Sequence, residues 1–290
     1  MPWISRLIAI LSLLLPSISS AQELWTPVTF ENVQSDLSLT GWLARPESSE
    51  SAPAAIFLHG CSGPGRGGAV SSTYTEWARI LTANGFAVLL VDSAGPRGFG
   101  ATCGPQPERK TMYLERPGDA YAGLRYLQQR DDIDPERIYL IGWSQGGGIT
   151  LLTMNSESIG RPEPAPRHDF RAAVAFYPAA CSRHLQERPY TTVEPGTWRT
   201  IAPLLILQGA DDNWTTAPPC EGFAGHLKSR GEPVEIVVYP DALHGFDAPN
   251  RPPRPLFSYR TASGEHPLVG TNAKARDAAI ADLLAFLRRH

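Results

Sequence analysis

Ser144 is the side chain in this sequence that is best placed to act as a nucleophile. It lies in the segment Gly142-Trp-Ser-Gln-Gly146, between an apolar run typical of a strand and an apolar run typical of a helix. This arrangement predicts a nucleophile elbow, a tight turn that projects the serine clear of a sheet. Strand and helix nearly touch at such a turn, so glycine is needed two residues to either side. The free N–H groups at the start of the helix would then face the oxygen that becomes negative during attack on an ester.

A carboxylate and a histidine follow two later apolar runs. Asp212 comes shortly after residues 204–208, and His244 comes shortly after residues 234–239. The carboxyl ends of parallel strands meet at one edge of a sheet, so both side chains are expected near Ser144. There His244 would take the proton from Ser144 and return it to the leaving group, while the carboxylate would hold the imidazole in the working tautomer.

The acid and the base have competitors in the sequence. Asp211 and then Asp241 are the alternatives to Asp212 as the acid, although Asp241 could cap its own turn. Four other histidines precede a strand, lie inside a helix or fall in long loops: His168, His226, His184 and His266. An isolated loop histidine is usually solvated, so His244 is the predicted base.

The segment 59–63 (His-Gly-Cys-Ser-Gly) directly follows an apolar run that ends at Leu58. A backbone N–H is needed at this place to share the oxyanion with the N–H of Gln145, and Cys61 is the predicted donor. The rival interpretation, a phosphate-binding loop, fails because no Lys-Ser or Lys-Thr pair follows.

The remaining pattern predicts an α/β protein with a doubly wound, mostly parallel sheet and right-handed crossovers. Alternation of apolar and polar residues predicts antiparallel edge strands at 24–30 and 37–44, whereas buried strands are predicted at 54–58, 86–91, 138–141, 172–177, 204–208 and 234–239. Helices are predicted at 74–83, 119–129, from Gln145 onward, at 217–229 and at 273–287.

The N-terminus has the composition of a signal peptide. Residues 1–21 carry one arginine, a nine-residue apolar run too short to span a bilayer, and small residues at the end. Cleavage there would leave residues 22–290 as one exported domain, with no stable membrane anchor expected. The net charge of −3 gives no reason to expect nucleic acid as a partner.

The exported part contains four cysteines, and an even number suggests two disulfides in an oxidising compartment. A zinc site is the rival, but no Cys-x-x-Cys or paired-histidine spacing is present, so no metal site is predicted. Cys61 and Cys103 follow the third and fourth predicted strands, and Cys181 and Cys220 follow the sixth and seventh. Neighbouring strand ends favour the pairs Cys61–Cys103 and Cys181–Cys220.

Long loops at the carboxyl edge are expected to shape the substrate pocket. In the loops 61–74, 92–116, 181–200 and 245–266, Lys and Arg outnumber Asp and Glu. One hypothesis is therefore a preference for anionic acyl substrates, with Arg97 as the first contact; the alternative is a solvated charged rim. Trp143 and Trp214 flank predicted active-site residues and are candidate substrate contacts, or packing residues alone.

Taken together, the motifs resemble the dienelactone hydrolase family of α/β-hydrolases. The segments that carry the resemblance are 58–61 (Leu-His-Gly-Cys), 91–98 (Val-Asp-Ser-Ala-Gly-Pro-Arg-Gly), 142–147 (Gly-Trp-Ser-Gln-Gly-Gly), 176–178 (Phe-Tyr-Pro), 209–214 (Gly-Ala-Asp-Asp-Asn-Trp) and 244–246 (His-Gly-Phe). The resemblance implies a sheet of about eight strands, and it puts Ser144, Asp212 and His244 at the triad positions.

One departure from this family concerns the nucleophile, which is cysteine in the founding enzymes and serine here. This difference favours a general carboxylester hydrolase that acts on a small ester or lactone without a cofactor. A serine peptidase, an acyltransferase and a non-catalytic binding protein on the same fold are the alternatives.

Overall fold

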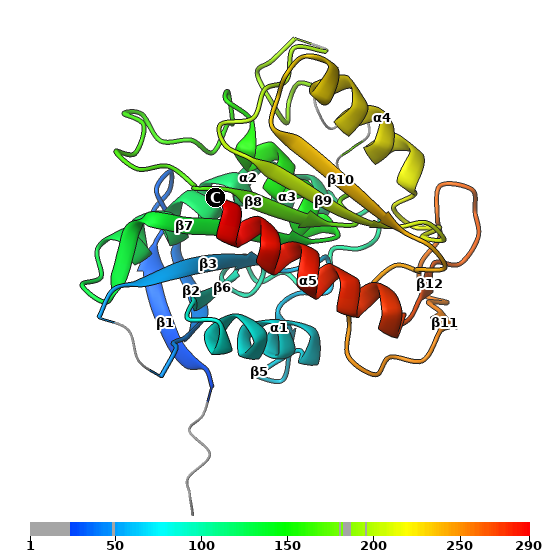
Figure 1. Ribbon diagram of the computed structural model, residues 1–290, viewed down its shortest axis with the longest axis horizontal. Helices are drawn as coiled ribbons and strands as arrows, with labels where there is room; N and C mark the ends of the chain where they lie inside the picture. The colour runs from blue at the N-terminus through cyan, green and yellow to red at the C-terminus, as the bar shows by residue number, and fades with distance from the viewer. Residues whose placement is uncertain (1–23, 48–49, 180, 182–186, 195) are drawn as a thin grey trace, which may run out of the picture.

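The computed structural model describes residues 24–47, 50–179, 181, 187–194 and 196–290 (Figure 1). Residues 1–21, which are expected to form a signal peptide, lie outside the described residues. In the part that is described, none of the helices combines the length and the apolar character needed to cross a membrane.

An eight-stranded sheet forms the centre of the structure, with the strand order β1-β2-β6-β3-β7-β8-β9-β10. β1 and β2 pair antiparallel, as do β2 and β6, and all the later neighbours are parallel. The predicted α/β class and mostly parallel sheet are therefore confirmed. The strands are β1 (Thr26–Glu31), β2 (Ser38–Ala44), β3 (Ala52–Leu58), β6 (Ala87–Asp92), β7 (Ile133–Trp143), β8 (Ala173–Phe176), β9 (Leu204–Gly209) and β10 (Val234–Tyr239).

Helices cover both faces of the sheet (Figure 1). One face packs against α1 (Ser72–Ala83) and α5 (Ala273–Arg289). The other packs against α2 (Pro107–Gln128), α3 (Gln145–Met154) and α4 (Ala217–Ser229). Side chains of a strand alternate between faces, so Ile56 and Leu58 of β3 enter one core and Ala55 and Phe57 enter the other.

Helix α2 is longer than the sequence predicts. The predicted helix spans 119–129, and residues 92–116 were expected to be a loop, yet α2 begins at Pro107. Pro117 and Gly118 directly precede the predicted start, and both residue types disfavour the interior of a helix, because proline lacks an N–H and glycine weakens helices. The helix instead continues through both residues, which are buried against the rest of the fold. As a result, Arg116 moves from an expected surface loop into the interior.

Four short strands and one 3₁₀ turn were not predicted. β4 (Gly65–Arg66) pairs with β5 (Ala69–Val70), and β11 (Arg254–Pro255) pairs with β12 (Leu268–Val269). The 3₁₀ turn spans Gly95–Arg97. β4 and β5 lie in the predicted loop 61–74, β11 lies in the predicted loop 245–266, and β12 lies just after that loop.

Candidate active site

Ser144 occupies the turn between β7 and α3, with backbone angles of φ 54° and ψ −111°. These angles are strained for a residue other than glycine. A Cβ on Gly142 would lie 2.2 Å from the carbonyl oxygen of Gly146, and a Cβ on Gly146 would lie 2.0 Å from that of Leu58. Glycine is therefore required at both positions so that β7, α3 and β3 can approach closely enough to form the turn.

The structure brings Ser144, His244 and Asp212 together. His244 follows β10, and its Nε2 lies 3.0 Å from Oγ of Ser144. Its Nδ1 lies 2.7 Å from Oδ2 of Asp212, which follows β9. With Nδ1–H donating to the carboxylate, Nε2 is left to accept the hydroxyl proton of Ser144. His244 and Asp212 are buried, while Ser144 is half-buried.

Four hydrogen bonds fix the Asp212 carboxylate. Oδ1 accepts from the backbone N–H groups of Trp214 (2.8 Å) and Thr215 (2.9 Å), and Oδ2 accepts from Oγ of Thr215 (2.9 Å) as well as from His244. The two alternative acids, Asp211 and Asp241, are exposed, so neither has the enclosed surroundings of Asp212. Thr215 was not singled out in the sequence, although its place three residues after Asp212 is a signal that could have found it.

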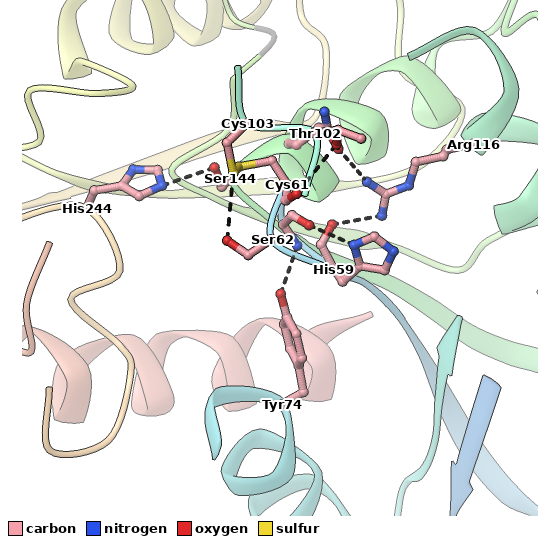
Figure 2. The surroundings of a disulfide bond; sticks show 11 residues. His59, Cys61, Ser62, Tyr74, Thr102, Cys103, Arg116, Ser144 and His244 are labelled. Atoms are coloured by element: carbon pink, nitrogen blue, oxygen red, sulfur yellow. Dashed lines mark hydrogen bonds between the residues drawn. A yellow bond between two sulfur atoms is a disulfide. The ribbon is translucent and has the colours of Figure 1, made fainter. Parts of the chain in front are cut away.

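Cys61 and Gln145 lie on the other side of Ser144. Gln145 is the first residue of α3, and among the described residues the backbone N–H groups of Gln145 and Cys61 have no hydrogen-bond partner. The neighbouring N–H of Gly60 donates to the hydroxyl oxygen of Tyr74 at 2.8 Å, which anchors the loop on α1 (Figure 2). Burial raises the pKa of Tyr74 to about 12, so this hydroxyl stays protonated.

Two disulfides border the site: Cys61–Cys103 and Cys181–Cys220. They are the pairs that the order of the strands predicted. Both line one cavity of about 280 Å³, which Ser144 and Gln145 also line. A second cavity, of about 380 Å³, opens on Ser144 from the side of His244.

The three predicted substrate contacts lie in different surroundings. Arg97 donates to Asp119 (2.8 and 2.9 Å) and Glu115 (2.6 Å), its side chain is only 7% exposed, and it lines neither cavity. The expectation that Arg97 is the first contact for an anionic substrate is therefore corrected, because the carboxylates of Asp119 and Glu115 on α2 already hold its guanidinium. Trp143 is buried and lines only the larger cavity, whereas Trp214 lines both.

Asp247 belongs to the loop 245–266, for which a solvated charged rim is one expectation. Its carboxylate is instead buried beneath the site. It accepts hydrogen bonds from Nε1 of Trp77 (2.7 Å), Nε1 of Trp143 (2.8 Å) and the hydroxyl of Tyr177 (2.7 Å). Burial and the adjacent Asp247 raise the pKa of Tyr177 well above its ordinary value, so its hydroxyl remains a donor. The ring of Tyr177 lies 4.6 Å from the ring of His244. Asp247 thus ties the residue before Ser144 to the loop that carries His244.

His59 is buried in the loop that follows β3, and it is neutral. Its Nδ1–H donates to the carbonyl of Gly60 at 2.7 Å, and its Nε2 accepts from the N–H of Ser93 at 3.3 Å. Burial and the positive charge of Arg116 lower the pKa of His59 well below its ordinary value. Its ring is therefore a fixed support for the loop at neutral pH.

Among the residues of the described chain, no three His, Cys, Asp or Glu side chains gather as a potential metal-binding group. The described site contains a serine within hydrogen-bonding distance of a histidine, a carboxylate behind that histidine, and two backbone amides without a hydrogen-bond partner among the described residues.

Comparison with known proteins assigns the family. Residues 39–290 match the model of the dienelactone hydrolase family. A candidate carboxymethylenebutenolidase of Escherichia coli (strain K12) is 32% identical over 136 residues, which are 47% of this chain and 44% of that protein. The chain therefore spans less than half of the length of this relative.

Two solved structures share the fold. The dienelactone hydrolase-like promiscuous phosphotriesterase P91 from metagenomic libraries has a TM-score of 0.66 and 17% identity, covering 92% of this chain and 99% of that one. Thermogutta terrifontis esterase 2, in a form phosphoramylated by tabun, has a TM-score of 0.62 and 18% identity, covering 92% and 94%. Identity this low shows the fold alone. The family match runs from β2 to the C-terminus and includes every residue of the site described above, so the chain belongs to the dienelactone hydrolase family, and this membership supports hydrolase activity.

Proposed function

We propose that the protein is a serine hydrolase that cleaves carboxylic esters or lactones through an acyl-enzyme intermediate. The observation that carries the proposal is the unbroken series of hydrogen bonds from Asp212 through His244 to Ser144. The backbone amides of Cys61 and Gln145, which have no hydrogen-bond partner among the described residues, complement this series.

In the first half-reaction, His244 removes the hydroxyl proton as Oγ of Ser144 attacks the substrate carbonyl carbon. Negative charge passes to the carbonyl oxygen, which accepts hydrogen bonds from the N–H groups of Cys61 and Gln145. Asp212 stabilises the imidazolium that forms. His244 then gives the proton to the departing alkoxide, which leaves as an alcohol, or as the free hydroxyl end of an opened lactone.

In the second half-reaction, water replaces the alcohol. His244 removes a proton from the water as its oxygen attacks the acyl-serine ester, and the same two amides hold the second oxyanion. Collapse of this intermediate releases the carboxylic acid and returns the proton to Ser144. Each residue therefore acts twice, which is why the enzyme regains its starting protonation state.

The proposal is tested with short-chain p-nitrophenyl esters and two proteins, the purified mature wild type and Ser144→Ala. We expect turnover by the wild type and a loss of about 10³-fold or more in a variant that is folded by circular dichroism. An inactive wild type, or a folded variant that keeps its rate, would contradict the serine mechanism.

We further infer that the preferred substrate carries a negative charge. Arg109 lines the smaller cavity, and Arg66 and Arg251 line the larger one, whereas no Asp or Glu of the described chain lines either cavity. Throughout the described ranges, none of these three arginines forms an ion pair. A guanidinium without an ion-pair partner can bind a carboxylate strongly in a partly desolvated cavity. The name of the Escherichia coli relative, a carboxymethylenebutenolidase, likewise denotes a lactone that bears a carboxyl group.

Two esters with acyl chains of equal length separate charge from size: p-nitrophenyl butyrate and mono-p-nitrophenyl succinate. Arg109→Gln and Arg251→Gln are each compared with Arg260→Gln, because Arg260 is exposed and lines neither cavity. At least one of the first two variants should lower kcat/KM for the succinate ester about 10-fold while changing the butyrate value less than about 2-fold. Equal changes for both esters would refute an anionic substrate.

We also infer that the protein is exported, with residues 1–21 removed to leave one catalytic domain from residue 22. The two disulfides are compatible with an oxidising compartment. N-terminal sequencing of protein recovered from outside the cytoplasm of an expression host should begin at residue 22.

A further inference from the structure

Arg116, on α2, is one of the most completely buried polar side chains in the structure, with 0% exposure. Its Nη2–H donates to the carbonyl of His59 at 2.8 Å, and its Nη1–H donates to Oε1 of the Gln145 side chain at 3.2 Å. One guanidinium thus joins the loop after β3 to the first residue of α3 (Figure 2).

These two contacts reach both proposed oxyanion donors. His59 lies two residues before Cys61, and Gln145 is itself the second donor. Thr102 completes the connection, because its N–H donates to the carbonyl of Cys61 at 2.8 Å and its hydroxyl donates to Oε1 of Gln145 at 3.1 Å. The orientation of the Gln145 amide is fixed as a consequence, since a guanidinium can only donate and must face the oxygen.

The charge of Arg116 has no direct counter-ion. In the part of the chain that the structure describes, no carboxylate lies within ion-pair distance of it, and the nearby Asp119 is engaged by Arg97. Burial lowers the pKa of Arg116 to about 10, which still leaves it charged at neutral pH. Keeping a lone buried charge costs several kcal/mol. That cost is offset only while negative charge stands nearby, and the proposed reaction creates such a charge on the other side of the loop.

We propose that Arg116 is a positioning residue of the oxyanion hole, which locks the Cys61 and Gln145 amides in place and puts a buried positive charge behind them. This inference rests on the proposed ester hydrolysis. It requires Arg116 to act in the transition state rather than in substrate binding, so its loss should lower kcat with little change in KM.

Three variants separate the charge of Arg116 from its contacts. Arg116→Met removes both, and Arg116→Lys keeps the charge with fewer hydrogen bonds. Gln145→Glu keeps an acceptor at the same place but adds a carboxylate that neutralises Arg116. Arg125→Met is the matched control, because Arg125 is an exposed arginine near the other end of the same helix.

We expect Arg116→Met to lower kcat about 10- to 100-fold with KM changed less than about 3-fold, and Arg116→Lys to restore part of the loss. Gln145→Glu should lower kcat about 10-fold without loss of thermal stability, and Arg125→Met should match the wild type. Binding of a short alkyl trifluoromethyl ketone, whose adduct with Ser144 carries an oxyanion, should weaken by the same factor as kcat/KM in each variant.

Circular dichroism and thermal melting identify any variant that fails to fold, in which case Arg116→Lys and Gln145→Glu carry the test. Folded variants with wild-type kcat and wild-type ketone affinity would overturn the inference. A Gln145→Glu variant with wild-type activity would also overturn the inference, because the role of Arg116 would then be structural only. A wild type that neither cleaves esters nor binds the ketone overturns the proposed function, and this inference with it.

Discussion

Two charged side chains, Arg116 and Asp247, are buried near the candidate site, and they differ in sign. Arg116 lies on the side of the Cys61 and Gln145 amides and contacts both segments that carry them. Asp247 lies on the side of His244, where it accepts hydrogen bonds from two tryptophans and Tyr177, and within the described residues it forms no ion pair. The site therefore has a fixed positive charge bound to the segments of Cys61 and Gln145, and a fixed negative charge bound to Tyr177, which packs on His244.

The difference in sign follows the charge separation of the proposed reaction. Attack by Ser144 creates a negative oxygen on the Arg116 side and a positive imidazolium on the Asp247 side. Each buried ion is thus arranged to stabilise the charge that forms nearest to it, before the substrate arrives. The two sides also differ in how they are held, since a disulfide fixes the oxyanion side whereas hydrogen bonds from neutral aromatic donors fix the base side.

The largest effects are expected from the disulfides, which offer a matched pair. Cys61–Cys103 and Cys181–Cys220 close segments of similar length, with separations of 42 and 39 residues, so removing either by double serine substitution should cost about 4 kcal/mol of stability. Only the first contains a proposed oxyanion donor, so only its loss should also lower kcat. Urea unfolding and p-nitrophenyl ester kinetics measure both. Equal losses of kcat in the two variants would show that the Cys61–Cys103 disulfide has no particular role in holding the Cys61 amide.

Asp247→Ala is expected to come next, with a loss of about 3 kcal/mol or more, because it leaves three buried donors without an acceptor. Asp277→Ala is the control, since Asp277 is 77% exposed and should change stability by less than about 0.5 kcal/mol. Urea unfolding at neutral pH gives both values. A loss as small as that of the control would mean that water satisfies the three donors.

Asp247→Asn separates the charge of Asp247 from its hydrogen bonds, because the variant removes the charge and keeps an acceptor. Without the buried negative charge, the imidazolium that His244 forms in the proposed reaction is less stable, so kcat for p-nitrophenyl esters should fall about 10-fold with little change in KM. A folded Asp247→Asn protein with wild-type kcat would rule out an electrostatic role for Asp247.

The smallest effect concerns acid stability on the oxyanion side. Burial and the charge of Arg116 lower the pKa of His59 in the folded state. Below about pH 6.5, His59 therefore binds a proton in the unfolded chain but stays unprotonated in the folded chain. Stability should fall on acidification by at most about 1.4 kcal/mol per pH unit from this group. His59→Gln should make the slope between pH 6.5 and 5 shallower than in the wild type, and His226→Gln, at an exposed site, should not. Equal slopes in all three proteins would contradict the prediction.

The part of the site that depends on local sequence could be predicted. Ser144, Asp212 and His244 each follow a strand within a few residues, and the parallel register brings those strand ends to one edge. The same reasoning gave the disulfide pairs. Register and edge position are set by the backbone, so a short sequence motif is enough to place these side chains.

The buried charges could not be predicted, because their surroundings come from distant parts of the chain. Arg116 contacts His59, 57 residues away, and Asp247 contacts Trp77, 170 residues away. A charged residue near Pro117 and Gly118 is typical of a surface loop, and only packing against the sheet shows that the helix continues through them. The hydrogen bonds of Arg97 with Asp119, 22 residues away, could not be predicted for the same reason.

Trp214 forms part of the wall of both cavities and packs its ring 5.0 Å from that of His244. A change in its volume therefore alters both cavities at once. The shapes of the two cavities cannot change independently through this position, so substitutions there should show strong epistasis with residues that line either cavity. Positions that line one cavity only, such as Arg109 and Leu256, are where a lineage of related enzymes can change one preference and keep the other.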